Sequence, residues 1–210
     1  MATLDMQGQE QVDAFKSWWK ENGKYAIAVL AVVVLSAGAV IGWQVYQAKQ
    51  ISEASILYAE LEKQLSSNDP KRINDAATVI IEKYSSTPYA PRAALLSSQV
   101  NIFVGDVVQA KTQLHWVFSH AKEAGLQNIA LLQLASILLD EKDYAGALKL
   151  LEETNDDAFA GLHADLKGDV LSSQGKIEEA RAAYQQALDK IDATSSYRNL
   201  IQIKLDGLAK

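Results

Sequence analysis

The chain has 210 residues, a net charge of −6 and no cysteine. The absence of cysteine excludes disulfide bonds and thiolate metal sites, and an acidic chain without a Lys/Arg cluster is a poor candidate for nucleic-acid binding. Only three prolines are present, none of them after Pro91, and Ala, Leu, Gln, Glu and Lys are abundant. This composition favours an all-α chain.

Residues 9–22 predict an amphipathic helix, because apolar side chains recur there at i, i+3, i+6 and i+7. These side chains are Val12, Phe15, Trp18 and Trp19. We expect Asn22-Gly23 to end this helix, since glycine readily takes the left-handed turn that follows a helix. Residues 1–24 are therefore interpreted as an amphipathic helix lying in the cytoplasmic membrane interface. A disordered tail is the alternative.

Residues 25–46 carry no charged side chain and no histidine over 22 positions. At about 1.5 Å per residue, this run is long enough to cross roughly 30 Å of hydrocarbon. A buried core helix is one alternative and a signal peptide is another. However, 24 residues precede the run, and its small-x-small sequence lies in its interior, where cleavage is not expected. Aromatic and basic residues at both borders predict interface anchors: Phe15, Trp18, Trp19, Lys20, Lys24, Trp43 and Tyr46.

Basic residues are unequally distributed about this predicted transmembrane helix. Lys16, Lys20 and Lys24 precede it, whereas Lys49 alone follows closely. Positive flanks stay in the cytoplasm, so we expect a single-pass membrane protein, which in a bacterium would lie in the inner membrane. Its N-terminus would be cytoplasmic and its C-terminal domain periplasmic.

The transmembrane run also holds a small-residue pair, Gly38-x-x-x-Gly42. Such pairs allow close helix packing in lipid, although the pattern often arises by chance. We regard Gly38 and Gly42 as candidate helix-packing positions.

No Gly or Pro interrupts the chain between Gly42 and Pro70, and apolar residues keep a helical period there. The transmembrane helix is therefore expected to continue to about residue 66. Residues 47–210 are assigned to the domain outside the membrane.

The domain repeats one pattern, in which a turn is followed by an apolar residue and then by an alanine. Ala110, Ala147 and Ala180 lie 37 and 33 residues apart, each with a larger apolar residue four positions later. Paired helices with a period near 34 are typical of tetratricopeptide repeats. Residues 195–208 predict an amphipathic helix that caps the last apolar face. The predicted fold is a single transmembrane helix followed by a tetratricopeptide-like, right-handed helical solenoid.

No catalytic, cofactor or metal site is expected from the sequence. His115 and His120 are five residues apart and do not share a helix face as metal ligands would. No phosphate-binding loop or nucleophile motif is present. We therefore do not expect an enzyme.

A solenoid offers a concave groove lined by the first helix of each pair. Arg92 is the only basic residue placed there, so a clamp for a C-terminal carboxylate is not expected. An apolar, mildly acidic groove suits extended apolar segments or a partner's helix. The alternative is that these side chains only pack helix against helix. The candidate groove residues are Leu95, Gln99, Ile102, Phe103, Ile129, Leu132, Leu139 and Leu162.

The order of motifs along the whole chain resembles the YfgM family of inner-membrane proteins. The matching motifs are Glu10-Gln11-Val12-Asp13, Trp18-Trp19, Asn22-Gly23-Lys24, Gly42-Trp43, Ala164-Asp165-Leu166-Lys167-Gly168-Asp169 and Gln174-Gly175-Lys176. The resemblance implies an ancillary subunit of the SecYEG translocon with periplasmic repeats. It also implies a membrane-anchored chaperone of the prolyl-isomerase type, PpiD, as a partner, and contact with newly exported chains.

Three functions therefore remain open at this point. The first is a non-catalytic translocon subunit that binds membrane subunits of the translocon, the lipid bilayer, the chaperone and emerging chains. The second is a scaffold or regulator of another envelope complex, such as stress signalling or wall synthesis. The third is a chaperone that acts alone.

Overall fold

The computed structural model describes residues 2–67, 69–153 and 156–208, and the side chains of residues 12–66, 69–153 and 156–208. These residues form α-helices joined by short turns, and no strand occurs among them. The all-α fold class is therefore confirmed. The chain divides into two compact units, Met1–Gln50 and Ile51–Lys210, which are described separately.

The first unit is formed by α1, which runs from Ala2 to Gln64 and extends into the second unit. The break expected at Asn22-Gly23 is absent, because both residues are helical. The Trp19 indole lies against Gly23, 3.2 Å from the position that a Cβ atom would take. Glycine therefore makes room for an aromatic ring one turn earlier and does not end the helix here.

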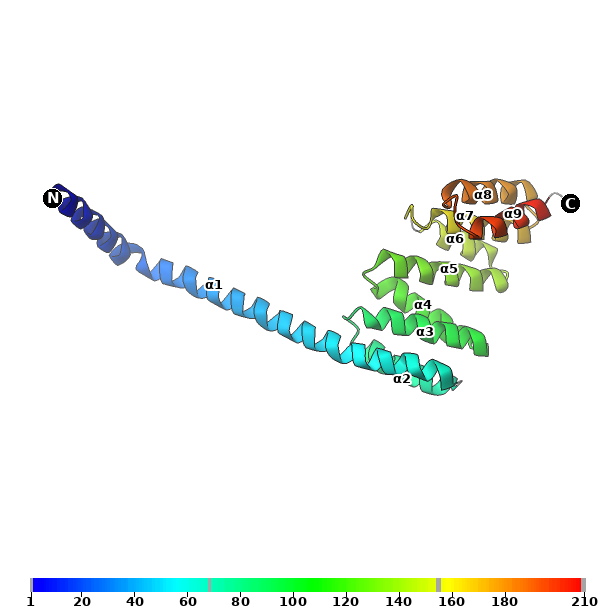
Figure 1. Cartoon of the computed structure of the whole chain (residues 1–210), viewed down its shortest axis with the longest axis horizontal. Coiled ribbons are helices and arrows are strands. Elements are labelled where there is room, and N and C mark those ends of the chain that lie inside the picture. The colour runs from blue at the N-terminus through cyan, green and yellow to red at the C-terminus, as the bar shows by residue number, and fades with distance from the viewer. Residues whose placement is uncertain (1, 68, 154–155, 209–210) are drawn as a thin grey trace. The chain divides into compact units, whose positions relative to one another are not determined.

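The second unit is a row of antiparallel helices joined by short turns (Figure 1). The end of α1 and the 3₁₀ turn Leu65–Ser67 lead into this row. The helices that follow are α2 (Pro70–Lys83), α3 (Tyr89–Val104), α4 (Val107–His120), α5 (Ala124–Asp140), α6 (Tyr144–Leu151), α7 (Ala160–Ser173), α8 (Ile177–Lys190) and α9 (Tyr197–Gly207).

The turns inside the helix pairs repeat one backbone geometry. Gly105, Lys142 and Gly175 all have positive φ angles, of 83°, 63° and 76°. Two of the three are glycine, which reaches this left-handed region without a steric penalty. After the first two turns an aspartate caps the next helix: Asp106 accepts from the N–H of Gln109 and Asp143 from that of Gly146. These equivalent turns confirm the predicted repeat.

Small side chains allow the helices of each pair to approach closely. The three alanines of the sequence pattern, Ala110, Ala147 and Ala180, are fully buried. Gly168 of α7 lies against the Tyr184 ring of α8, where an added Cβ atom would come within 2.5 Å of the ring. The bulky residue of one helix thus fits a position without a side chain on its neighbour.

The last helix covers the apolar face that the repeats leave at their end. Ile201 of α9 is fully buried in a cluster with Ala180, Tyr184 and Leu188 of α8. A solenoid needs such a terminal helix, because its last repeat has no successor to pack against. The predicted capping helix is therefore confirmed as α9.

The Gly168–Tyr184 contact predicts opposite results for two alanine substitutions. Gly168→Ala should destabilise the protein by about 1–3 kcal/mol, because Tyr184 is buried and cannot move aside freely. Gly207→Ala should be neutral or stabilise by up to about 1 kcal/mol, since nothing lies within 4 Å of its added Cβ. Urea unfolding of the two full-length variants, followed by circular dichroism, measures the difference. Equal midpoints would contradict the packing described here.

Candidate partner-binding surface

One side of α3 carries a row of residues at helical spacing. Arg92, Leu96, Gln99 and Phe103 follow one another at intervals of four, three and four, with Val100 beside them. This spacing places all five on one side of the helix. The side chains change from basic to apolar toward the end of α3.

An apolar hollow of about 460 Å³ lies at this end of α3. Its walls come from the residues after α1, from the start of α2 and from α3. The lining residues are Leu65, Pro70, Ile73, Leu96, Gln99, Val100 and Phe103. Phe103 is 90% exposed, although burial of such a ring from water is worth about 1.5–3 kcal/mol. An exposed aromatic side chain beside an apolar hollow is typical of a binding surface.

The apolar character does not continue into the next repeat. The positions of α5 that lie 37 residues after Leu96, Gln99 and Phe103 are Gln133, Ser136 and Asp140. The apolar surface is therefore confined to the first repeats of the solenoid.

Arg92 is paired with a carboxylate of this chain. Its guanidinium donates to both carboxylate oxygens of Glu123, over 2.8 and 2.7 Å. This hydrogen bonding holds the pKa of Glu123 below its usual range and raises that of Arg92. The pair joins α3 to the start of α5, so the one basic residue predicted in the groove already has a partner.

The predicted groove residues divide into three groups. Gln99 and Phe103 line the hollow, and Ile102 is exposed next to Phe103. Leu95 does not belong to the groove, because it is 8% exposed and packs in the core. The remaining four are exposed or half-buried on later helices and do not line the hollow: Ile129, Leu132, Leu139 and Leu162.

Five of the seven residues that line the hollow were not predicted from the sequence. Leu96 and Val100 could have been found by extending the helical spacing from Arg92 to Phe103. Leu65 lies in the 3₁₀ turn after α1, and Pro70 and Ile73 lie in the first turn of α2, so the spacing along α3 gives no signal for these three.

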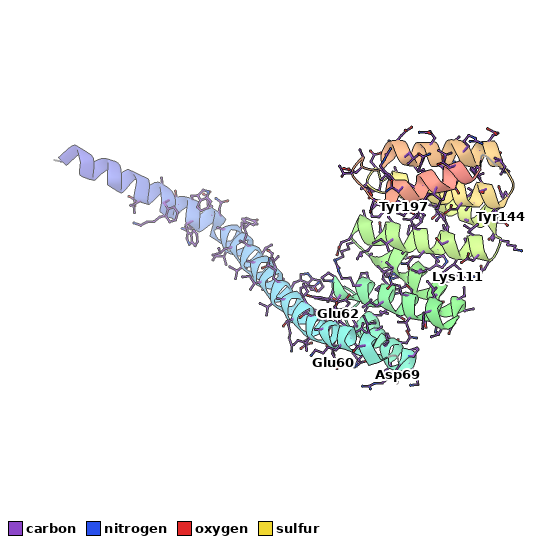
Figure 2. The ribbon with its side chains drawn as sticks, turned by 45° about the vertical axis from the view of Figure 1, so that its right-hand side comes forward. Glu60, Glu62, Asp69, Lys111, Tyr144 and Tyr197 are labelled. Carbon is purple, nitrogen blue, oxygen red and sulfur yellow. The ribbon has the colours of Figure 1, made fainter. Side chains whose placement is uncertain are left out.

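Farther along the solenoid, α9 is bound to α7 by a cluster of charged and hydroxyl groups. Lys204 donates to Asp165 over 2.8 and 2.9 Å and to Asp169 over 2.7 Å. Tyr197 and Tyr184 each donate to one of these carboxylates over 2.7 Å. Burial raises the pKa of both tyrosines, and the hydrogen bonds to the carboxylates raise it further. The phenols therefore keep their protons and act as donors (Tyr197 is labelled in Figure 2).

Removal of the Lys204 ammonium should destabilise the protein, because Asp165 is only 2% exposed. We expect Lys204→Met to cost about 3 kcal/mol, since a buried carboxylate loses its cation. The matched control, Lys190→Met, breaks an exposed pair with Asp157 that spans 3.9 Å and should cost less than about 1 kcal/mol. Urea unfolding compares the two, and a similar loss in both variants would contradict this role of the cluster.

His163 is a buried titratable group in the last repeats. It is 8% exposed and lines a polar hollow of about 280 Å³ formed by α7, α8, the end of α6 and the segment before α7. Its Nδ1 lies 3.4 Å from the Leu151 carbonyl oxygen, and its Nε2 has no hydrogen-bond partner among the described residues. Burial lowers the pKa of His163 below its usual value. The hydrogen bond with the Leu151 carbonyl and the charge of Asp156 raise this pKa, but by less. The fold therefore favours the neutral ring.

This burial predicts a pH dependence of stability. The unfolded chain binds the His163 proton more readily than the folded chain, so the stability contributed by the neutral ring is complete above about pH 6.5 and declines as the pH falls below it. His163→Gln should lose less stability than the wild type between about pH 7.5 and pH 5. Urea midpoints at both pH values measure this, and parallel losses would contradict it.

The first unit carries the residues predicted as membrane anchors. The Phe15, Trp18 and Trp19 rings lie with centroids 6.0–6.4 Å apart, and Trp43 lies 6.0 Å from Tyr46. Lys24 lies over the Tyr25 ring at 5.0 Å, and Lys20 is exposed. An anchoring role for these residues stays a prediction. Nothing lies within 4 Å of an added Cβ at Gly38 or Gly42, so this face of α1 is open.

Within the described residues, one helix is long and apolar enough to cross a membrane. It is the Val12–Gln64 part of α1, and its most apolar stretch has a mean hydropathy of 2.5 and is not buried. No group of three or more metal-ligating side chains occurs in the parts of the chain that the structure describes.

Known proteins resemble the chain over most of its length. The model of the tetratricopeptide repeat-like domain family matches residues 16–210. A Neisseria gonorrhoeae protein named "Ancillary SecYEG translocon subunit" is 33% identical, over 97% of this chain and 98% of that protein. A protein of the same name from Escherichia coli is 29% identical, over 95% of this chain and 96% of that protein.

A solved structure supports the fold alone. MamA from Desulfovibrio magneticus RS-1 superposes with a TM-score of 0.54 at 18% sequence identity, covering 74% of this chain and 89% of that chain. These similarities confirm both the repeat fold and the family expected from the sequence motifs.

Proposed function

Because the chain belongs to the family of ancillary SecYEG translocon subunits with a tetratricopeptide repeat-like domain, we propose that it is a non-catalytic subunit of the protein translocon. The named relatives match it nearly from end to end, and they include the apolar helix as well as the repeats. The proposal therefore concerns the whole chain.

In this proposal α1 holds the protein in the inner membrane. The exposed apolar stretch of α1 supports a single membrane crossing. The excess of lysine before this stretch supports a cytoplasmic N-terminus and a periplasmic repeat domain. The open face at Gly38 and Gly42 is suited to contact with membrane helices of the translocon.

The apolar hollow at α3 is the observation that carries the proposed role of the repeat domain. Its occupant would be an apolar segment of a membrane-anchored chaperone of the PpiD type or of an emerging exported chain. Burial of Phe103 against such a segment would supply binding energy that the free protein leaves unused. The Arg92–Glu123 pair argues against recognition of a free C-terminal carboxylate.

A double substitution in the hollow tests this role. Phe103→Ser with Val100→Ser should lower the amount of co-purified chaperone and exported chains by at least about fivefold, equivalent to about 1 kcal/mol. The control is Val108→Ser, because Val108 is 74% exposed and does not line the hollow. Tagged full-length variants are purified from native membranes in mild detergent, and their partners are quantified by mass spectrometry.

The same purification decides between the first two of the open functions. Equal amounts of chaperone and exported chains with both variants would contradict the role of the hollow. If the wild type brings down no translocon subunit and instead a stoichiometric stress-signalling or wall-synthesis complex, the translocon proposal is wrong.

A further inference from the structure

We propose that the hollow binds an extended apolar segment and that the Gln99 side chain recognises one peptide group of its backbone. A helical segment with the same apolar side chains is discriminated against. This inference rests on the proposed function, in which the hollow binds an apolar segment, and adds the conformation that the segment must have. It follows from the hydrogen-bonding groups of the hollow.

Gln99 has the only polar side chain among the seven residues that line the hollow. The other six are Leu, Ile, Val, Pro or Phe, whose side chains neither donate nor accept a hydrogen bond. Along α3, Leu96 lies three positions before Gln99 and Phe103 lies four positions after it, on the same side of the helix. A segment that contacts both Leu96 and Phe103 therefore passes over Gln99.

The Gln99 amide is not engaged within the chain. No hydrogen bond joins its side chain to another of the residues that the structure describes, and the residue is exposed. The buried polar residues of α3 differ in this respect. Ser97 donates to Asn74 of α2 over 2.8 Å, and Asn74 donates to Asn101 over 2.6 Å. Gln99 is therefore the polar group of the hollow that a bound segment has to satisfy.

A segment that covers the hollow removes the Gln99 amide from water. Burial of an amide without hydrogen-bond partners is unfavourable, so the segment must offer both a donor and an acceptor. A backbone peptide group has one N–H donor and one C=O acceptor, and their partial charges are complementary to those of the Gln99 C=O and NH₂. An apolar segment has no polar side chain for this purpose, so its backbone must supply the partner.

Only an extended segment has such peptide groups available. In a helix each interior N–H already bonds to the C=O four residues earlier, whereas an extended segment pairs none of them within itself. Leu96 and Phe103 are seven positions apart on α3, about 10 Å, which about three residues of extended chain can cross. The apolar walls supply affinity, and Gln99 determines which backbone conformation is preferred.

The experiment uses full-length protein in detergent micelles and fluorescent synthetic peptides. The parent peptide has a core of four β-branched apolar residues between neutral Ser-Gly ends. In its derivatives one core amide at a time is replaced by an ester, which removes one N–H donor and keeps the side chains. Fluorescence anisotropy, corrected with protein-free micelles, should show a loss of affinity of at least about fivefold for one of these esters, equivalent to about 1 kcal/mol. A peptide with the same apolar residues, held helical by lactam bridges, should bind at least about tenfold more weakly than the parent.

Two glutamine substitutions form a matched pair of variants. Gln99→Leu should bind the parent peptide within about threefold of the wild type, since the apolar walls remain, but should no longer distinguish the parent from the ester. Gln109→Leu should keep the wild-type distinction, because Gln109 of α4 is exposed and does not line the hollow. Phe103→Ser should weaken the binding of all peptides alike, because it removes an apolar wall that they share.

Equal affinities for the parent and every ester, equal affinities for the parent and the helical peptide, or no binding of any peptide would overturn the inference. An ester effect that persists in Gln99→Leu, or that is lost equally in Gln109→Leu, would overturn it as well. These outcomes are separable from the proposed function. If translocon subunits still co-purify, only the backbone recognition fails. If the ester effect depends on Gln99 but no translocon subunit co-purifies, the recognition stands and the translocon role fails.

Discussion

The solenoid depends on the burial of helix faces that no single helix pair can cover. At the N-terminal end of the solenoid, the last turns of α1 cover the exposed helix faces, and Ala54 and Leu61 of α1 are fully buried. At its end α9 does so through Ile201. Because each repeat contacts only its neighbours, these two terminal helices determine whether the row between them has a complete core. One continuous helix, α1, thus contains both an apolar stretch long enough for a membrane and the first element of the repeat domain.

The proposed binding surface lies where this cover is incomplete. Leu96, Val100 and Phe103 lie on one side of α3 and line a hollow together with residues of the turn after α1 and of the start of α2. Farther along, polar residues replace these side chains, and α9 is bound across α7 by Lys204 and Asp165. The last repeat is therefore covered by α9, whereas the first repeats leave an apolar hollow exposed. This asymmetry makes the first repeats the natural place for a partner.

Local patterns made much of this fold predictable. The spacing of Gly105, Ala110 and their equivalents indicated the repeats, since two of the three turns carry glycine and each close helix contact carries an alanine. Other features depended on distant parts of the chain. Arg92 and Glu123 are 31 residues apart, and Lys204 and Asp165 are 39 apart, so no local pattern could pair them. At Gly23 the pattern was misleading, because a glycine that often ends a helix here accommodates the Trp19 ring.

Site-specific photo-crosslinking in native membranes tests the central claim most directly. A photoreactive residue in place of Gln99 would lie in the hollow, and one in place of His115 would lie on another surface, at the hollow between α2 and α4. The account predicts products with a membrane-anchored chaperone or with exported chains from position 99, and far fewer from position 115. Equal products from both positions, or products from position 115 alone, would contradict it.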